Sequence, residues 1–228
     1  MQKGIVTEQD IDDAAKCILR QKLRFAKTIA APDPNLYSKD KVYCQEHQQL
    51  ALESARKGCV LLQNQNQLLP LDRSIIKSIA VIGKLANTAN IGDMGSSRVY
   101  PTHTVTPLEG IRQVVGPNIA VSFDVGKSIE AARNTAQSAD VAIIVAGFTY
   151  KDEGEFIVFH GGDRSRLSLQ KHDEALINAV AKVNPKTIVV LEGGSAIITE
   201  AWRKNVGGIL MAWYPGMAGG TAIAEILF

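Results

Sequence analysis

Short runs of apolar, often β-branched residues recur along the chain, separated by stretches with helical periodicity. Runs that end in glycine or another small residue are typical of strands buried on both faces of a sheet. They occupy residues 59–62, 79–83, 141–145, 187–191 and 208–212. Amphipathic helical patterns cover residues 50–58, 129–138, 171–182 and 218–227. The alternation predicts an α/β fold, a three-layer α/β/α sandwich with a mostly parallel, roughly six-stranded sheet.

The N-terminal region follows a different pattern. Apolar positions from Ile11 to Leu19 repeat at helical spacing, and Thr7 precedes them as an expected N-cap. The text AAPDPNLYSKDK that follows is typical of an extended linker, because its prolines, Asn and Asp disfavour a packed element. We therefore expect a terminal helix in residues 1–27, a linker in residues 28–46 and a sandwich domain in residues 47–228.

Composition narrows the classes of partner. Lys and Arg number 25 and Asp and Glu 23, so the net charge of +2 does not indicate a nucleic-acid-binding protein. The 3 cysteines are an odd number with no C-x-x-C pair and no His at ligand spacing, so they predict neither a zinc site nor a disulfide framework. No apolar run approaches the roughly 18 residues of a membrane helix, so we expect no membrane partner. Localisation stays unknown, since a cytoplasmic, periplasmic or secreted protein fits equally well.

A nucleotide site is the first chemistry that a strand, a glycine and a helix can indicate. Gly83 follows a predicted strand, but the text Lys84-Leu85-Ala86-Asn87 after it lacks the further glycines of a dinucleotide fingerprint and the Lys-Ser/Thr of a P-loop. We therefore expect no nucleotide cofactor and no metal.

A long acidic loop follows the predicted strand at residues 141–145. Residues 147–164 place carboxylates among aromatic residues and glycines, and ligands of parallel sheets bind at the carboxyl ends of strands. Glu153 and Glu155 supply the carboxyl group that a general acid requires. A solvated acidic loop has the same composition, so residue types alone leave both interpretations open.

A second polar loop, residues 92–101, combines glycines with Ser96, Ser97 and Arg98. Hydroxyl and guanidinium groups can hydrogen-bond a polyol, although Arg98 could equally pair with an acid of its own domain. Serine-hydrolase chemistry has no support, because Ser195 lies outside any G-x-S-x-G pattern.

Taken in order, several segments resemble glycoside hydrolase family 3, specifically its second, α/β-sandwich domain. The matching sequence segments are ALESA (51–55), VLLQN (60–64), LLPL (68–71), IAVIG (79–83), GSS (95–97), TVTPLEGI (104–111), GDR (162–164), LSL (167–169) and WYPGMAGG (213–220). The resemblance covers residues 47–228. The helix predicted in residues 1–27 is similar to the last helix of the family's preceding (β/α)8 barrel.

The resemblance implies a β-glucosidase-like retaining β-glycosidase that hydrolyses terminal non-reducing β-linked sugars. It also implies that the active site lies between two domains. Retaining hydrolysis uses a nucleophile and an acid/base. In this family the nucleophile is an aspartate of the barrel, which this chain does not contain. The acid/base of the family is a glutamate of the loop that corresponds to residues 147–163. By its position in this loop, Glu153 is assigned this role, and Glu155 is the alternative.

The resemblance also assigns supporting roles. Asp163 and Arg164 are expected to brace the loop or reach a sugar hydroxyl, and Ser96, Ser97 and Arg98 to line an outer subsite. The expected partners are a β-linked glucoside or oligosaccharide and the missing N-terminal barrel. We expect the domain to be truncated at its C-terminal end and the chain alone to be inactive. A non-catalytic module that binds carbohydrate or docks a barrel is the alternative, and sugar specificity stays open.

Overall fold

The computed structural model describes residues 5–26, 39–92, 95–155 and 164–228. The chain divides into two compact units, Met1–His47 and Gln48–Phe228. In the first unit, helix α1 (Glu8–Arg24) has Thr7 as its N-cap, as the sequence predicts, and the side chains of Thr7 and Asp10 form a capping box. No side chain of α1 is buried, although its spacing is amphipathic. The proposed division into helix, linker and domain stays a prediction, and residues 27–38 lie outside the described part.

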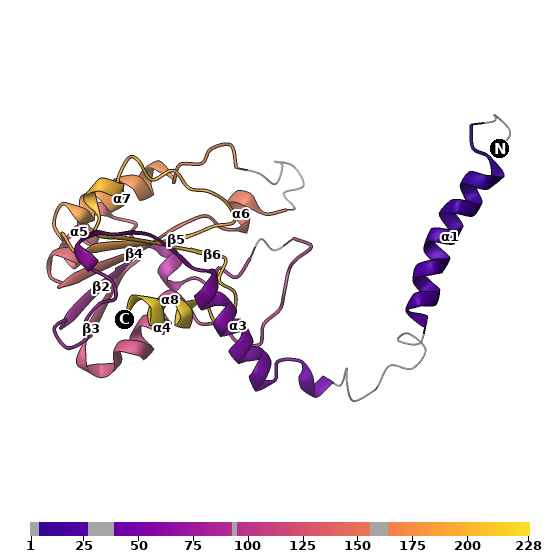
Figure 1. Cartoon of the computed structure of the whole chain (residues 1–228). Coiled ribbons are helices and arrows are strands. Elements are labelled where there is room, and N and C mark those ends of the chain that lie inside the picture. The colour runs from indigo at the N-terminus through magenta and orange to yellow at the C-terminus, as the bar shows by residue number, and fades with distance from the viewer. Residues whose placement is uncertain (1–4, 27–38, 93–94, 156–163) are drawn as a thin grey trace. The chain divides into compact units, whose positions relative to one another are not determined.

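The second unit is built on one six-stranded sheet in the order β1-β6-β5-β4-β2-β3 (Figure 1). The strands are β1 (Val60–Asn64), β2 (Ser78–Ile82), β3 (Ala120–Asp124), β4 (Val141–Gly147), β5 (Thr187–Glu192) and β6 (Gly208–Trp213). All neighbours pair in parallel except β1 with β6, which is antiparallel. The predicted fold class is therefore confirmed.

Helices cover both faces of the sheet (Figure 1). The α-helices of this part of the chain are α3 (Gln45–Gly58), α4 (Pro107–Val115), α5 (Ile129–Gln137), α6 (Tyr150–Glu153), α7 (Lys171–Ala181) and α8 (Gly219–Leu227). Its short 3-10 helices are η2 (Gln65–Gln67), η3 (Lys84–Asn87), η4 (Gly116–Asn118) and η5 (Arg203–Asn205), while η1 (Lys39–Lys41) belongs to the first unit. Helices α4 and α8 pack in one hydrophobic core and α5 and α7 in the other, which makes three layers.

The residues of strand β2 suit a strand that helices cover on both faces of the sheet. Ile79 and Val81 belong to the core under α4 and α8, whereas Ala80 and Ile82 belong to the core under α5 and α7. Because successive side chains of a strand point to opposite faces, a strand covered on both sides has to be apolar throughout.

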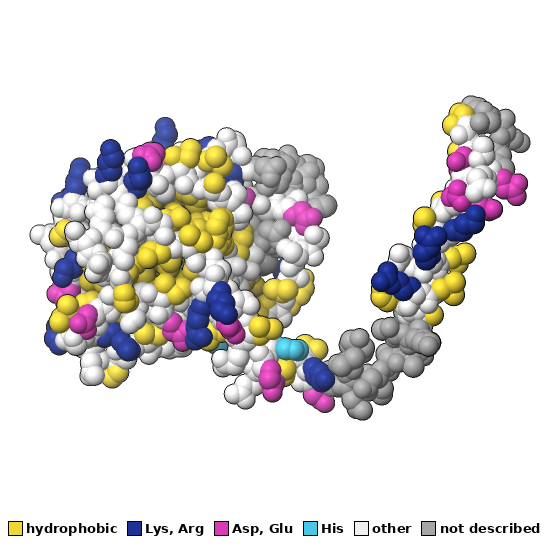
Figure 2. All heavy atoms as spheres, in the orientation of Figure 1, with side chains coloured by type: hydrophobic (Ala, Val, Ile, Leu, Met, Phe, Trp, Pro, Cys, Tyr) yellow, Lys and Arg dark blue, Asp and Glu magenta, His cyan; other side chains and the backbone are white. Residues whose placement is uncertain are grey.

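Strand β3 and helix α4 are among the elements that the sequence patterns do not predict. Strand β3 pairs with β2 at the sheet edge, and its residues are at most partly buried, so its pattern is weaker than that of the central strands. Helix α4 begins at Thr106 with a capping box to Glu109 and a proline in its first turn, both start signals of a helix. Edge strand β1 differs in another way, because its apolar residues Val60, Leu61 and Leu62 are exposed. Figure 2 shows apolar side chains gathered on the face that β1 crosses.

Candidate active site

The carboxyl ends of β4, β5 and β6 meet at one edge of the sheet. Helix α6, which ends at Glu153, follows β4; Gly193 and Gly194 follow β5; and Tyr214 follows β6. Gly147 makes the close turn out of β4, because a Cβ there would lie 1.8 Å from the carbonyl oxygen of Glu192. The loop with the candidate glutamates therefore lies at the edge where the sequence predicts a ligand site.

Both carboxylate oxygens of Glu153 have hydrogen-bond donors. Its Oε2 lies 2.6 Å from Nε of Arg164, and its Oε1 accepts a hydrogen bond of 2.7 Å from the Tyr214 hydroxyl. The backbone N–H of Gly194 also donates to Oε1. Charge-assisted bonds of this kind are stronger than neutral ones, so they hold the Glu153 side chain firmly in place.

Arg164 is itself fixed by its surroundings. Its guanidinium lies 4.0 Å from the ring centre of the buried Phe148, and its Nη2 donates to the carbonyl oxygen of Ala196 at 2.9 Å and to Oγ of Ser195. The side chains of Arg164 and Glu153 are only 5% and 8% exposed. Arg164 thus joins the end of α6 to the loop after β5, whereas Asp163 lies outside the described residues; the roles expected of both stay predictions.

Tyr214 remains a donor over the whole working range of pH. Its burial, and then the hydrogen bond and negative charge of Glu153, raise the pKa of the phenol well above its usual value. The phenol therefore keeps its proton and continues to donate it to the carboxylate.

Glu155 has a different environment from Glu153. It is exposed, and its Oε2 accepts a hydrogen bond from the backbone N–H of Ser96. This contact joins the two loops that the sequence singles out. Arg98 does not join them in the same way, because its guanidinium lies 4.7 Å from the ring centre of Tyr100.

A cavity of about 650 Å³ opens beside Glu153 and its partners Arg164, Gly194 and Tyr214. Its lining consists of Ile91, Gly92, Ser97, Glu153, Arg164, Leu167, Gly194, Ser195 and Tyr214. Such a volume lies within the usual range of small-molecule sites. Ser97 thus lines the cavity with Glu153, while Ser96 contacts Glu155.

Sequence reasoning missed Glu192, the residue at the end of β5. Its side chain is 1% exposed, and burial raises the pKa of its carboxyl to about 8, although a hydrogen bond from Asn90 opposes part of that rise. Nδ2 of Asn90 donates to Glu192 and to the carbonyl oxygen of Phe148, both at 2.9 Å. The pair ties together the loops that follow β2, β4 and β5. An acidic residue closing an apolar strand was the available signal.

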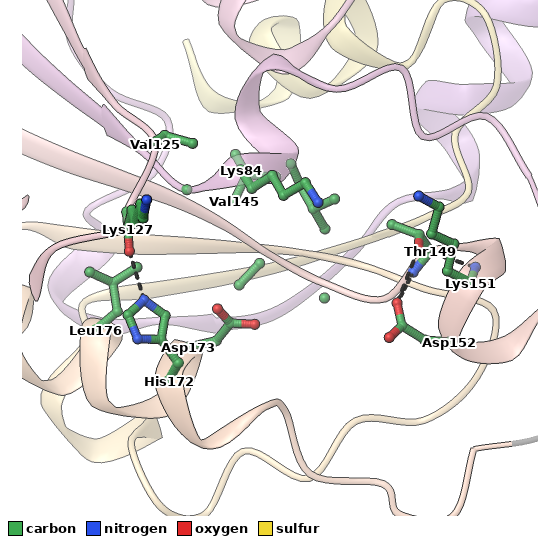
Figure 3. Close-up of a pocket in the computed structure, with 15 residues that line it drawn as sticks. Lys84, Val125, Lys127, Val145, Thr149, Lys151, Asp152, His172, Asp173 and Leu176 are labelled. Atoms are coloured by element: carbon green, nitrogen blue, oxygen red, sulfur yellow. Dashed lines mark hydrogen bonds between the residues drawn. The ribbon is translucent and has the colours of Figure 1, made fainter.

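A second cavity, of about 660 Å³, lies at the carboxyl ends of β2, β3 and β4 (Figure 3). Thr149, Lys151 and Asp152 line it, whereas Glu153, next in the same short helix, lines the first cavity. Helix α6 therefore contributes side chains to both of these cavities.

The part of the chain that the structure describes contains no group of three or more His, Cys, Asp or Glu side chains that could hold a metal ion. Among those same residues, no helix has the length and apolar character needed to cross a bilayer.

The architecture and the carboxylate-lined cavity define an α/β-sandwich domain with a candidate sugar site at the carboxyl edge of its sheet. Residues 59–228 match the family description "Glycosyl hydrolase family 3 C-terminal domain". The chain therefore belongs to glycoside hydrolase family 3, as the sequence motifs indicate.

Relatives of known name agree with this family. The chain is 32% identical over 231 residues to a "Beta-xylosidase" of Formosa agariphila, covering 96% of this chain and 31% of the relative. It is 35% identical to "Beta-D-xylosidase 3" of Arabidopsis thaliana, covering 99% of this chain and 30% of the relative. Among solved structures, a family 3 β-glucosidase of Bifidobacterium adolescentis superposes with a TM-score of 0.81 at 28% identity, covering 100% of this chain and 32% of that one. The chain thus spans about a third of the length of these proteins.

Proposed function

We propose that this chain is the part of a retaining β-glycosidase that supplies the general acid/base and one wall of the sugar pocket. The observation that carries the proposal is the cavity at the carboxyl edge of the sheet, in a domain of family 3: Glu153 lines it, and Glu155 accepts a hydrogen bond from Ser96, the neighbour of the lining residue Ser97. The nucleophile of such an enzyme belongs, on this proposal, to the N-terminal domain with which the family pairs this one.

The contacts of the two glutamates favour Glu155 as the acid/base, the alternative in the assignment from sequence. A general acid must exchange its proton with the glycosidic oxygen and then with water, so it needs an accessible carboxyl group. Both oxygens of Glu153 are engaged by Arg164, Tyr214 and Gly194, and its side chain is almost fully buried. Glu155 is exposed at the same edge.

In this division of roles, Glu153 is a positioning residue. Its ion pair with Arg164 and its bond from Tyr214 fix the end of α6, from which the chain continues to Glu155. Glu155 protonates the leaving-group oxygen while the nucleophile of the other domain attacks the anomeric carbon, and then removes a proton from the water that releases the sugar. Ser97 lies where it can hydrogen-bond a sugar hydroxyl.

The substrate class that we propose is a terminal β-linked xyloside or glucoside. The sequence relatives named above are β-xylosidases, whereas the structural neighbour is a β-glucosidase, and both sugars are pyranosides that fit a cavity of about 650 Å³. Without a nucleophile, the isolated chain is expected to hydrolyse neither.

A chimeric enzyme tests the proposal. The chain replaces the matching segment of the Formosa agariphila β-xylosidase, and hydrolysis of aryl β-xyloside and aryl β-glucoside is measured for the chimera and its variants. We expect Glu155→Gln to lower turnover by about 10²–10⁴-fold, and azide to restore turnover of substrates with good leaving groups. Glu200→Gln, at an exposed site, is the matched control and should retain activity.

Glu153→Gln separates the two glutamates. A positioning role predicts a loss of activity that azide does not restore, together with a lower melting temperature. Near-normal turnover of Glu155→Gln together with azide rescue of Glu153→Gln would instead return the acid/base role to Glu153. Near-normal turnover of both variants would support the non-catalytic module, and turnover by the chain alone would show that the nucleophile is not in the other domain.

A further inference from the structure

The second cavity occupies the position where open α/β sheets bind ligands. Strand β2 leads to α4, which packs in one core, whereas the neighbouring β4 leads to α7, which packs in the other. The connections therefore diverge, and a crevice opens at the carboxyl ends of these strands. Its volume of about 660 Å³ is sufficient for a metabolite of moderate size.

Cationic side chains from three different segments line this cavity. Lys84 follows β2, Lys127 follows β3 and Lys151 lies on α6. Of the two acidic side chains in the lining, Asp152 is engaged within its own helix, because its Oδ2 accepts hydrogen bonds of 2.9 and 3.0 Å from N and Oγ1 of Thr149. Ammonium groups from separate segments are suited to a phosphate, which lysine binds as a point charge.

Asp173 supplies the complementary chemistry. Figure 3 shows its carboxylate and the side chain of Lys84 pointing into the cavity. Within the described ranges no hydrogen bond to the Asp173 carboxylate is found, and partial burial raises its pKa. The neighbouring His172 is already engaged, since its Nε2 lies 2.7 Å from the carbonyl oxygen of Gly126. A half-buried carboxylate facing a cavity is a natural acceptor for ligand hydroxyl groups.

We propose that this cavity binds the phosphate ester of a polyol, a sugar phosphate or a mononucleotide, with the phosphate among Lys84, Lys127 and Lys151 and the hydroxyls at Asp173. The phosphate is held by side chains, which explains why the segment after Gly83 carries no glycine-rich phosphate motif. The proposal is independent of the glycosidase function, because binding here requires neither Glu153 nor Glu155.

Calorimetric titration of the full chain tests it. Glucose 6-phosphate and AMP are titrated at about 0.15 M salt, which screens unspecific attraction to surface lysines, with inorganic phosphate and glucose as reference ligands. We expect saturable binding of at least one ester, about tenfold or more tighter than inorganic phosphate. The ester that binds with the higher affinity shows whether the site prefers a sugar phosphate or a nucleotide.

Variants locate the binding. Lys84→Gln should weaken ester binding by about tenfold or more, and Asp173→Asn should weaken the esters while leaving inorganic phosphate unchanged. Lys182→Gln, at the exposed C-cap of α7, is the matched control, and Lys127→Gln replaces Lys84→Gln if that variant does not fold. Absence of saturable binding up to about 10 mM, equal affinity for phosphate and ester, or equal effects of the cavity and control variants would each overturn the proposal.

Discussion

The two cavities beside α6 differ in how their charges are satisfied. On one side, Glu153 and Arg164 are buried and neutralise each other within a set of hydrogen bonds. On the other, Lys84 and Lys151 are exposed, and Asp173 faces the cavity without a hydrogen bond from any described residue. Asp152 and Glu153 are consecutive residues of one short helix, yet Asp152 lines the cavity with the exposed lysines and Glu153 lines the cavity with the buried ion pair.

The difference teaches which charges hold the structure and which are available for a ligand. Removing one partner of a buried ion pair leaves an uncompensated charge in a site of low polarity, which is costly. Replacing an exposed lysine changes the stability of the folded protein little, because water already solvates the charge. We therefore expect stability to depend on the Glu153 side of α6 and ligand affinity on the lysine side.

Breaking the buried pair should have the largest effect. Arg164→Gln leaves Glu153 without a counter-charge and removes the cation over Phe148, so we expect a loss of about 3–5 kcal/mol in the free energy of unfolding. Urea denaturation measures it. Arg203→Gln is the control, because Arg203 pairs with Glu200 at 2.8 Å on the surface and should cost at most about 1 kcal/mol. Equal losses for the two variants would remove the distinction between the cavities.

Glu192 should make stability fall as the pH rises. Its folded pKa of about 8 lies above the ordinary value of 4.5, so between these two values the folded protein keeps a proton that the unfolded chain releases. The contribution of Glu192 is therefore complete below pH 4.5 and is lost progressively as the pH approaches 8, by at most about 1.4 kcal/mol per pH unit.

Comparison of urea denaturation at about pH 5 and about pH 8 isolates this effect. Glu192→Gln keeps the shape and the bond from Asn90 but cannot titrate, so its stability should fall less with pH than that of the unsubstituted chain. Glu200→Gln, an exposed change, should leave the pH dependence unaltered. The same dependence in both Gln variants and the parent chain would mean that Glu192 does not hold a proton in the folded state.

The central layers of the fold could be predicted from sequence, because burial on both faces dictates the residues. Strands β2, β4, β5 and β6 and helices α5, α7 and α8 lie where the apolar runs and the helical periodicity predict them. Strand β3 could not be found in this way, because an edge strand keeps polar residues such as Ser122 and Asp124 among its apolar ones.

The candidate site could be predicted to the loop but not to the residue. Position after a central strand indicates residues 147–164, yet the roles of Glu153 and Glu155 depend on partners far away in sequence, Arg164, Tyr214 and Ser96. Glu192 escaped notice for a related reason. Its partner Asn90 lies on another loop, and only the fold brings the two side chains together.

The smallest expected effect concerns the element that the two cavities share. Thr149 caps α6, because its Oγ1 accepts from the backbone N–H of Lys151 at 3.2 Å and donates to Asp152 at 3.0 Å. Thr149→Ala should cost about 1 kcal/mol, as N-cap substitutions usually do. Since α6 has one turn, we expect the loss of stability to be local. The backbone amides of Glu153 and Gly154 donate to the carbonyl oxygens of Thr149 and Tyr150, so their hydrogen exchange should become faster.

Thr106→Ala provides the matched control for this change. Thr106 forms the same kind of capping box at the start of α4, but it lines neither cavity. Both variants should lose similar stability, whereas only Thr149→Ala should speed exchange at α6 and weaken binding of the phosphate ester. Equal behaviour of the two variants would show that α6 is held by its buried ion pair and not by its cap.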